Sequence, residues 1–333
     1  MATPISGAQQ TGHRSTAPVF VLGCVRSGTT LLYHMLLSAG KFAVYRTESS
    51  VFNLLEPRFG DLSIERNRQR LLEVWCESKL FKASGLDKDS ISAKVMSECR
   101  NGGDFLRIVM SEIARRQGVP RWADTTPEHL LYLHRIKQTI PEALIIHIIR
   151  DGRDVALSTD KQGYIRRLPW DRTPSKMAAG LYWDWMVSKG RRDGRDLGDD
   201  YMEVHFENLI RDPRQALSGI GEFIDQDLDY DQILRVGIGS VSSPNTSFGA
   251  GANFKPVGRW RSGFSNEELL MFESLVGRAL EENGYVLATA NHEKGSDLRL
   301  MRATYLKYFD TKLYLKANTP LGQLLATRDF SWL

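Results

Sequence analysis

The sequence predicts an α/β fold with a mainly parallel central sheet flanked by helices. Three short apolar segments have strand character, at residues 19–23, 143–149 and within 200–210. Each is followed by a segment of helical character, and this alternation is typical of a parallel sheet. Residues 143–149 are apolar almost throughout, as expected for a strand covered on both faces.

The first predicted strand leads into a glycine loop. The segment VLGCVRSGTT occupies residues 21–30, and Gly23 and Gly28 have the spacing of a phosphate-binding P-loop. A helix is expected from about Thr29 to Leu37, so the loop lies between a strand and a helix, as that motif requires. A Walker loop would contain a lysine before the threonine, but this sequence has Gly28 followed by two threonines.

This loop is a candidate anion site. Backbone N–H groups of residues 24–29 and the N-terminus of the next helix can surround an anion. Thr29 and Thr30 can donate hydroxyl hydrogen bonds, and Arg26 supplies a permanent charge with a forked set of donors. The alternative is a tight turn in which Arg26 is solvated, because glycines mark turns of every kind.

A helical, strongly charged segment separates the first two strands. Apolar residues recur at helical spacing around the stretch MSEIARR, as Ile108, Ile113 and Val119 illustrate. Asp104 or Gly103 is expected to cap this helix at its N-terminus. Residues 53–118 are expected to form a helical insert within the domain.

The second predicted strand ends in Arg150 and Asp151. A Walker NTPase needs an acidic residue at a strand end to hold Mg²⁺, and Asp151 has that position. Arg150 beside it disfavours a metal, so the segment indicates a second anion site without one. In the alternative, Arg150 is an ion-pair partner of Asp151 or Asp154, and Ser158 is a helix-surface serine.

These two segments carry a resemblance to a known family. RSGTTLL, followed about 120 residues later by IIHIIRDGRDVALST, resembles the cofactor motifs of sulfotransferases that use 3′-phosphoadenosine 5′-phosphosulfate (PAPS). The resemblance implies a P-loop NTPase-like sulfotransferase fold. It also implies a 5′-phosphosulfate loop formed by Arg26, Ser27, Gly28, Thr29 and Thr30.

The second motif resembles the family's 3′-phosphate site. Arg150 and Ser158 stand eight residues apart. The arginine leaves the strand end and the serine lies on the next helix, so that both can converge on one phosphate.

Two later segments extend the resemblance, which covers roughly residues 19–288. In YMEVHFENLIRDPRQALSGIGEFI, Phe206 takes an aromatic position that lies near the adenine in relatives; a core aromatic is the alternative. FKPVGRWRSGFSNEELLMFE resembles a segment that folds over the nucleotide. This implies phosphate-side ligands among Lys255, Gly258, Arg259 and Arg261, although the full Arg-Lys-Gly signature of the cytosolic enzymes is absent.

The resemblance implies an in-line displacement on sulfur. Arg26 would stabilise the charge on the leaving oxygen electrostatically, since arginine does not readily donate its proton. Glu48 is the candidate general base by similarity to the tyrosylprotein enzymes, after a one-residue shift; an exposed loop glutamate is the alternative. Asp124 and His129 are rival bases, and His129 is flanked by leucines that favour a structural role.

The expected organisation is a disordered tail (1–18), a sulfotransferase domain (19–290) with residues 53–118 as a helical insert on its acceptor side, and a C-terminal helical extension (291–333). In the extension, Leu298, Met301, Tyr305, Tyr308 and Leu315 fall near one helical face, with basic residues around it. We expect this helix to dock on the same chain. A homodimer contact and a peripheral contact with anionic lipid are the alternatives.

Composition limits the partners. With 42% apolar and 25% charged residues and a net charge of +4 over 333 residues, the chain is globular and has no basic block that would indicate nucleic acid. Cys24, Cys76 and Cys99 lack metal-ligand spacing and suit a reducing compartment. No apolar run approaches a membrane span or a signal core. We therefore expect a cytoplasmic protein without a metal.

The acceptor is not specified by the sequence. It is expected to present a hydroxyl or an amine, on a glycan, a lipid, a small molecule or a peptide tyrosine. Tyr164, Trp170, Trp183 and Trp185 are stacking candidates, of which the last two are better explained by helix packing. The rival functions are a P-loop nucleotide kinase or NTPase and a non-catalytic nucleotide-binding module.

Overall fold

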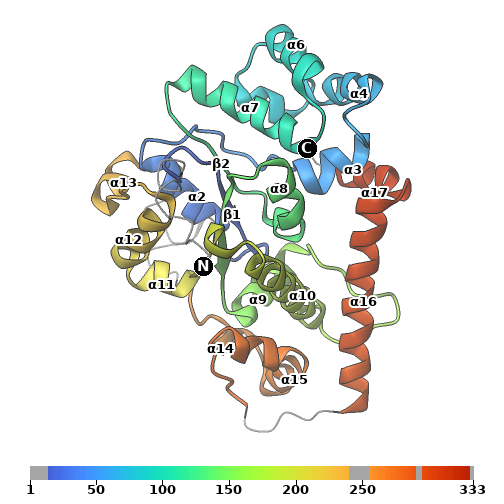
Figure 1. Cartoon of the computed structure of the whole chain (residues 1–333). Coiled ribbons are helices and arrows are strands. Elements are labelled where there is room, and N and C mark those ends of the chain that lie inside the picture. Colours follow the sequence, from blue (N-terminus) through green and yellow to red (C-terminus); the bar gives the residue numbers. More distant parts are fainter. Residues whose placement is uncertain (1–13, 240–254, 290–294, 331–333) are drawn as a thin grey trace, which may run out of the picture.

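The computed structural model describes residues 14–239, 255–289 and 295–330 (Figure 1). Its centre is a four-stranded sheet in the order β2-β1-β3-β4, and every neighbouring pair is parallel. The strands are β1 (Val19–Leu22), β2 (Ala123–Asp124), β3 (Leu144–Ile149) and β4 (Tyr201–His205). The predicted α/β fold with a parallel central sheet flanked by helices is confirmed.

The sheet separates two hydrophobic cores because successive side chains of a strand point to opposite faces. In β1, Phe20 and Leu22 belong to one core, whereas Val19 and Val21 belong to the other. β3 alternates in the same way and is buried along its whole length. An almost uninterrupted apolar strand is thus explained by cover on both faces.

Helices pack on both faces of the sheet (Figure 1). One core receives side chains from α2 (Thr29–Ser38), α11 (Phe206–Arg211), α12 (Pro213–Ile224) and α13 (Tyr230–Val236). The other receives them from η2 (Pro127–Tyr132), α8 (Leu133–Thr139), α9 (Gly152–Gln162) and α10 (Ser175–Arg195), among others.

The chain order creates a switch point at the carboxyl ends of β1 and β3. From β1 the chain passes to β2 on one side of β1, and from β2 it passes to β3 on the other side. In open α/β sheets, ligands bind in the crevice outside such a point. The glycine loop leaves β1 here and Arg150 leaves β3 here, so the topology brings the two predicted anion motifs to one edge.

The insert between β1 and β2 is helical, as predicted, but one cap differs. Its helices are η1 (Val51–Leu55), α3 (Glu56–Phe59), α4 (Glu65–Trp75), α5 (Lys79–Ser84), α6 (Lys88–Glu98) and α7 (Gly102–Gln117). Asn101, and neither Gly103 nor Asp104, caps α7, and its side chain accepts a hydrogen bond from the backbone N–H of Asp104 at 3.0 Å. The predicted cap was wrong because Asp104 instead lies in the first turn and accepts from the N–H of Arg100.

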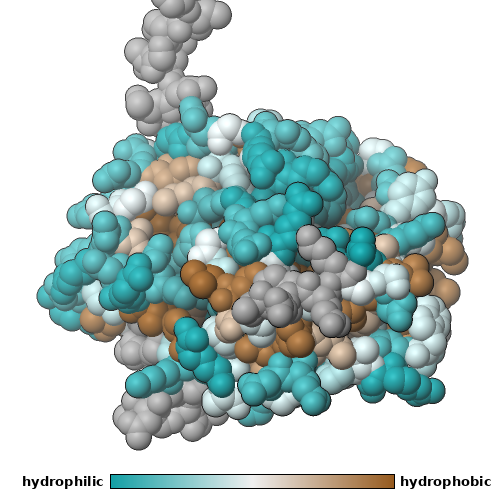
Figure 2. Space-filling view, turned by 90° about the horizontal axis from the view of Figure 1, so that it is seen from below, coloured by the Kyte–Doolittle hydropathy of each residue, from teal (hydrophilic) through white to brown (hydrophobic). Residues whose placement is uncertain are grey.

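α14 (Trp260–Gly263) and α15 (Asn266–Glu282) lie on the underside of the molecule in Figure 1. A capping box of Ser265 and Glu268 begins α15, Asn283 caps its end, and Gly284 follows with a left-handed φ of 78°. Figure 2 shows that hydrophobic residues gather on the face seen from below. Leu270 of α15 and Val286 after it are among the exposed apolar residues.

The C-terminal extension docks on the same chain, as predicted. α16 (Ser296–Asn318) packs along α10, and α17 (Leu321–Phe330) packs against α3 (Figure 1). Tyr305 and Phe309 are buried, whereas Tyr308 of the predicted stripe is 41% exposed. None of the described helices is long and apolar enough to cross a membrane.

The described part of the predicted N-terminal tail also contacts the domain. Arg14 donates hydrogen bonds to the carbonyls of Phe223 and Asp199, both at 2.8 Å, and Ala17 is buried. Residues 14–18 therefore belong to the packed structure. The remainder of the predicted disordered tail, residues 1–13, lies outside the described residues.

Candidate active site

The loop after β1 has an anion-binding backbone. Arg26 and Gly28 adopt left-handed φ values of 70° and 100°, and the N–H of Ser27 donates to the carbonyl of Cys24 at 3.0 Å. α2 begins at Thr29, and no side chain caps it. The first N–H groups of α2 and its dipole therefore face the loop without a side-chain acceptor, as an anion site requires.

Gly28 is required by close packing as well as by its φ. A Cβ at this position would lie 2.3 Å from the ring of Phe206. The Phe206 ring is 2% exposed, and the guanidinium carbon of Arg150 lies 4.5 Å from its centre. Phe206 thus has mainly the contacts of a core aromatic, although its edge borders the cavity described below.

Two arginines and a serine join the two predicted motifs. Arg26 Nε donates to Ser158 Oγ at 3.0 Å, and Arg150 Nη1 donates to the carbonyl of Arg26 at 2.8 Å. Arg150 Nη2 donates to the carbonyl of Pro256. Arg150 therefore connects the end of β3, the glycine loop and the segment around Pro256. Ser158 bonds Arg26 directly, and the convergence of Arg150 and Ser158 on one phosphate stays a prediction.

The electrostatics of this corner are positive. Burial is the main cause that lowers the pKa of Arg150, and the nearby charges of Arg259 and Arg26 lower it further. Asp154 and Glu207 act in the opposite direction. An anion bound here would relieve the repulsion among three guanidinium groups.

Two buried polar atoms at this corner are left unsatisfied. Among the described residues, neither Ser27 Oγ nor Arg150 Nε has a hydrogen-bond partner. Ser27 is 0% exposed and Arg150 is 7% exposed, and buried polar groups are nearly always paired. These orphaned donors fit a ligand that brings acceptor oxygens, as a phosphate does.

A cavity of about 350 Å³ opens beside Arg150 and the glycine loop, a size within the usual range of ligand sites. The predicted site residues Ser27 and Ser158 are not among the described residues that line it. Seven of the residues that line it were predicted as site residues: Arg26, Gly28, Thr29, Thr30, Glu48, Arg150 and Phe206. Tyr164, a predicted stacking residue, lines it as well. The others are Val25, Leu31, Pro127, Glu128, Ile165 and Tyr182.

Glu48 lines the same cavity as Arg26 and Arg150. Its side chain keeps an exposed surface, but the cavity walls desolvate the carboxyl. Desolvation first, and then the negative charges of Asp124 and Glu128, raise its pKa to about 7. A carboxyl with this pKa can accept a proton near neutral pH.

Asp124 and His129, the rival bases, are buried in the interior. They are 3% and 0% exposed, and His129 Nδ1 lies 2.9 Å from Asp124 Oδ2. The backbone N–H of Phe52 donates to His129 Nε2 at 3.1 Å. Both ring nitrogens are therefore engaged, and neither residue borders the cavity.

The pKa of Asp124 reflects this pairing. Burial alone would raise it, but the contacts with His129, Ser49 and the N–H of Thr126 together lower it. Asp124 is thus held as a carboxylate that orients His129 and the start of η1.

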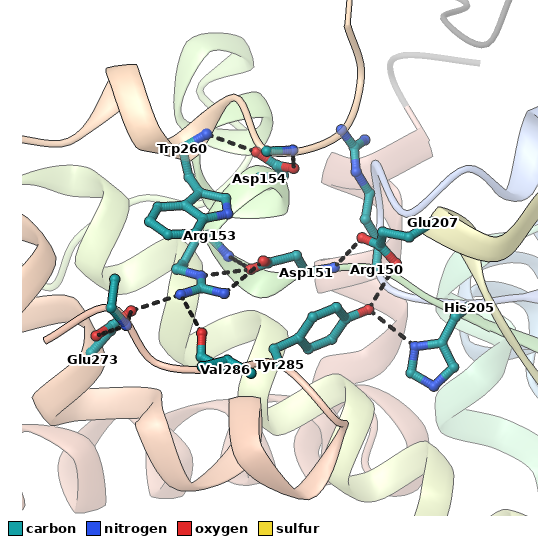
Figure 3. A network of polar contacts seen from close by, with 12 residues as sticks. Arg150, Asp151, Arg153, Asp154, His205, Glu207, Trp260, Glu273, Tyr285 and Val286 are labelled. Carbon is teal, nitrogen blue, oxygen red and sulfur yellow. Dashed lines mark hydrogen bonds and ion pairs between the residues drawn. The ribbon is translucent and has the colours of Figure 1, made fainter. Parts of the chain in front are cut away.

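The segment around Gly258 and Trp260, called the late segment below, is attached to α9 by the carboxylate of Asp154. Asp154 Oδ2 accepts from the N–H of Gly258 at 2.7 Å, and Oδ1 accepts from the N–H of Trp260 at 2.9 Å (Figure 3). Arg259 lies close enough to Arg150 to lower its pKa. Lys255 and Arg261 are exposed and do not border the cavity, and the guanidinium carbon of Arg261 lies 4.3 Å from the Trp260 ring centre.

A buried ion-pair network supports this corner from below (Figure 3). Arg153 bonds both oxygens of Asp151, at 2.9 and 2.8 Å, and also Glu273 at 2.7 Å. The N–H of Asp151 donates to Glu207, which also accepts from Tyr285. Asp151 is thus the partner of Arg153, and its carboxylate is engaged in the architecture of the strand end.

Sequence reasoning missed several wall residues. Glu128 follows Asp124 closely in the segment DTTPEHL, and its acidic character was a usable signal. Tyr182 and Ile165 carried no such signal, because only tertiary packing brings α10 and the segment before it to the cavity. Trp183 and Trp185, by contrast, are 0% and 7% exposed and pack in the core as expected.

Comparison with known proteins gives one family. A family model described as "Sulfotransferase family" matches residues 18–231, well over half of the chain. An uncharacterized protein of Aquifex aeolicus (strain VF5) is 24% identical over 221 residues, which are 64% of this chain and 26% of that protein. The chain thus spans about a quarter of the length of this curated relative.

Solved structures show distant likeness. The sulfotransferase domain of the Synechococcus PCC 7002 olefin synthase is 16% identical, with a TM-score of 0.44 and coverage of 89% of this chain and 95% of that one. Sulfotransferase STF9 from Mycobacterium avium is 16% identical, with a TM-score of 0.46 and coverage of 83% of this chain and 79% of that one. Retinol dehydratase in a complex with retinol and PAP is 17% identical, with a TM-score of 0.42 and coverage of 83% of this chain and 84% of that one. Likeness at this level assigns no individual residue.

Proposed function

The chain belongs to the sulfotransferase family, and we propose that it transfers a sulfuryl group from PAPS to a hydroxyl (or amine) of an acceptor, giving 3′,5′-ADP and a sulfated product. The observation that carries this proposal is the junction of Arg26, Ser158 and Arg150 at the carboxyl ends of β1 and β3. It provides two guanidinium groups, a hydroxyl and the N-terminus of α2 at one edge of the cavity.

Binding of the donor is assigned to this junction. The loop N–H groups, Ser27, Thr29 and Thr30 would hold the 5′-phosphosulfate. Arg150, through its orphaned Nε, and Ser158 would hold the 3′-phosphate. Phe206 would support the adenine side through its edge, and Arg259, with Gly258 bonded to Asp154, would close the phosphate side.

The chemistry is assigned to Arg26 and Glu48, which both line the cavity. Arg26 would stabilise the negative charge that develops on the bridging oxygen as the sulfur–oxygen bond breaks. Glu48 would take the proton from the acceptor oxygen that attacks sulfur, and its raised pKa suits this role near neutral pH. Asp124 and His129 would position η1 without touching the reactants.

The acceptor would enter beside Tyr164, Ile165 and Tyr182, which line the same cavity as Glu48 and Glu128. A glycan, a lipid, a small phenol and a peptide tyrosine are all compatible with aromatic walls of this kind. We place the protein in the cytoplasm, because Cys24, Cys76 and Cys99 are free, buried thiols.

Labelled PAPS tests this function. The full chain is incubated with PAPS labelled in its sulfuryl group and a panel of phenols, saccharides, hydroxylated lipids and tyrosine peptides, with and without EDTA. We expect transfer to one acceptor class that EDTA does not abolish. Binding of 3′,5′-ADP without any transfer would indicate a nucleotide-binding module, and Mg²⁺-dependent ATP turnover would indicate an NTPase.

A further inference from the structure

One wall of the cavity comes from a segment without regular secondary structure. Residues 163–174 connect α9 to α10 and contain neither helix nor strand. Tyr164 and Ile165 at the start of this loop line the cavity. Tyr164 is 58% exposed, so its position depends on how the loop is held.

A single hydroxyl of the C-terminal helix holds the middle of this loop. Tyr305 of α16 is 1% exposed. Its hydroxyl accepts from the N–H of Leu168 at 3.0 Å and donates to Asp171 Oδ2 at 2.6 Å. Asp171 also accepts from the N–H of Thr173 at 2.8 Å through its other oxygen. The Tyr305 hydroxyl is therefore connected through Asp171 to Thr173, near the end of the loop.

Packing between the loop and α16 is incomplete. Between the loop and α16 lies a hollow of about 260 Å³, lined by Leu168, Trp170, Asp171, Asp297, Leu300, Met301, Thr304 and Tyr305. Leu168 at its edge is buried in the core, whereas Trp170 and Leu300 are exposed. On the side of the hollow, the Tyr305 hydroxyl is therefore the polar contact that ties the loop to α16.

The same helix supports a second wall residue. The rings of Phe309 and Tyr182 meet edge to face, with centroids 5.3 Å apart. Tyr182 lines the cavity from α10, and Phe309 lies one helical turn after Tyr305. α16 is further fixed by Arg302 on Asp184 and by Asp310 on Trp185, each at 2.8 Å.

We infer that α16, which lies outside the residues that match the family, forms part of the acceptor site of the proposed transferase. Tyr305 and Phe309 are positioning residues that hold the loop 163–174 and Tyr182 against the cavity. Neither touches the donor corner at Arg26 and Arg150, so α16 sets how the acceptor is held without setting how PAPS is bound. This inference rests on the proposed function for the identity of the two substrates.

Hydrogen–deuterium exchange of the full chain tests the structural step. Tyr305→Phe keeps the ring but leaves the buried N–H of Leu168 without its acceptor, so exchange of residues 163–174 should be at least about fivefold faster. Tyr314→Phe is the matched control, because Tyr314 lies on the same helix and is 62% exposed. Asp171→Ala removes the partner from the loop side while α16 stays intact, and it should also speed exchange of the loop.

Two further readouts separate positioning from general destabilisation. The affinity for 3′,5′-ADP should stay within about twofold in all three variants, and with the acceptor found by the labelled-sulfuryl screen Tyr305→Phe should raise the KM for acceptor at least about threefold and leave the KM for PAPS unchanged. Unchanged loop exchange in both Tyr305→Phe and Asp171→Ala, or equal changes in the two KM values, would overturn the inference. If the unmutated chain fails to bind 3′,5′-ADP, the proposed function fails while the exchange result still decides the role of Tyr305.

Discussion

Arg26 is the residue on which the proposed chemistry depends most. It lines the cavity, its Nε bonds Ser158, and its carbonyl is held by Arg150. Charge on the leaving oxygen develops only in the transition state, so the contribution of Arg26 should appear in turnover more than in binding.

Arg26→Ala is therefore expected to lower kcat by about 10²–10³ and to change the KM for PAPS much less. Steady-state kinetics with varied PAPS at saturating acceptor measure both constants. Arg66→Ala, which removes an exposed arginine of α4, is the control and should behave as the unmutated chain. A normal kcat for Arg26→Ala at saturating PAPS would exclude the electrostatic role.

Glu48 predicts a pH profile. Its raised pKa of about 7 means that the basic form is lost as the pH falls below neutrality. Activity should rise with pH through this range and level off above it. Glu48→Gln should lower the rate by a factor of about 10²–10⁴, and the remaining activity should no longer rise with pH through this range.

Glu128→Gln provides a second check on Glu48. It removes one of the negative charges that raise the pKa of Glu48. The rise of activity with pH should therefore move to lower pH, while activity is retained. Rates measured from pH 5.5 to 9 give both profiles. If the rate of Glu48→Gln still rose with pH in the same range, the titration would belong to another group.

Single residues show what a motif can and cannot predict. The meeting of the glycine loop and Arg150 could be predicted because the two motifs are recognised by local spacing, and the structure brings them into contact. The hydrogen bond between Ser158 and Arg26 could not be predicted in this way. Spacing indicates which elements meet, but it does not indicate whether the guanidinium group of Arg26 or that of Arg150 bonds the Ser158 hydroxyl. His129 was a rival base by residue type alone; its burial and the bond from Phe52 arise from packing of η1, which the sequence does not display.

At the scale of elements, the segment around Gly258 and Trp260 is bonded to α9 through Asp154, whose two carboxylate oxygens each accept from one backbone N–H of that segment. Asp154→Asn leaves one oxygen to accept where two accepted before, so one of the two N–H groups loses its partner. Because Arg259 lies between them, we expect the affinity for 3′,5′-ADP to fall about fivefold or more.

Calorimetric titration measures this effect of Asp154→Asn. Asp160→Asn, on the same helix but near its end, is the matched control and should bind as the unmutated chain does. An affinity unaffected by Asp154→Asn would mean that the late segment does not contribute to the nucleotide site.

The elements themselves were largely predictable, and their edges less so. β3 was recognised because a strand covered on both faces is apolar throughout, and α2 because a glycine loop preceded it. The cap of α7 was misplaced, because Asn101, Gly103 and Asp104 are all reasonable cap residues and only the observed bond selects Asn101. The contribution of α10 and the loop before it to the cavity is tertiary and left no periodic signal.

At the scale of the whole molecule, the C-terminal extension is part of the packed domain. Removal of residues 291–333 would expose the surface under Tyr305 and Phe309 and leave the buried Asp184 without Arg302. An unpaired buried charge is strongly destabilising. We expect truncation after Ala290 to lower the melting temperature by several degrees or to reduce solubility.

Thermal unfolding and size-exclusion chromatography of the truncated chain check this expectation. A truncated protein that keeps its melting temperature, its oligomeric state and its activity on a soluble acceptor, yet no longer sediments with anionic vesicles, would favour a membrane role for the extension. A changed oligomeric state with retained stability would favour a dimer contact.

The whole account requires that the edge between β1 and β3 recognise a nucleotide with two separate phosphate groups. The most direct measurement is the dissociation constant of the unmutated chain for 3′,5′-ADP and for 5′-AMP, determined by calorimetry, with Ser158→Ala and Arg150→Ala beside it. Charge-assisted hydrogen bonds are worth about 1.5–3 kcal/mol each, so we expect at least about tenfold tighter binding of 3′,5′-ADP, a smaller preference in Ser158→Ala and none in Arg150→Ala. Equal affinity of the unmutated chain for the two nucleotides would contradict the account.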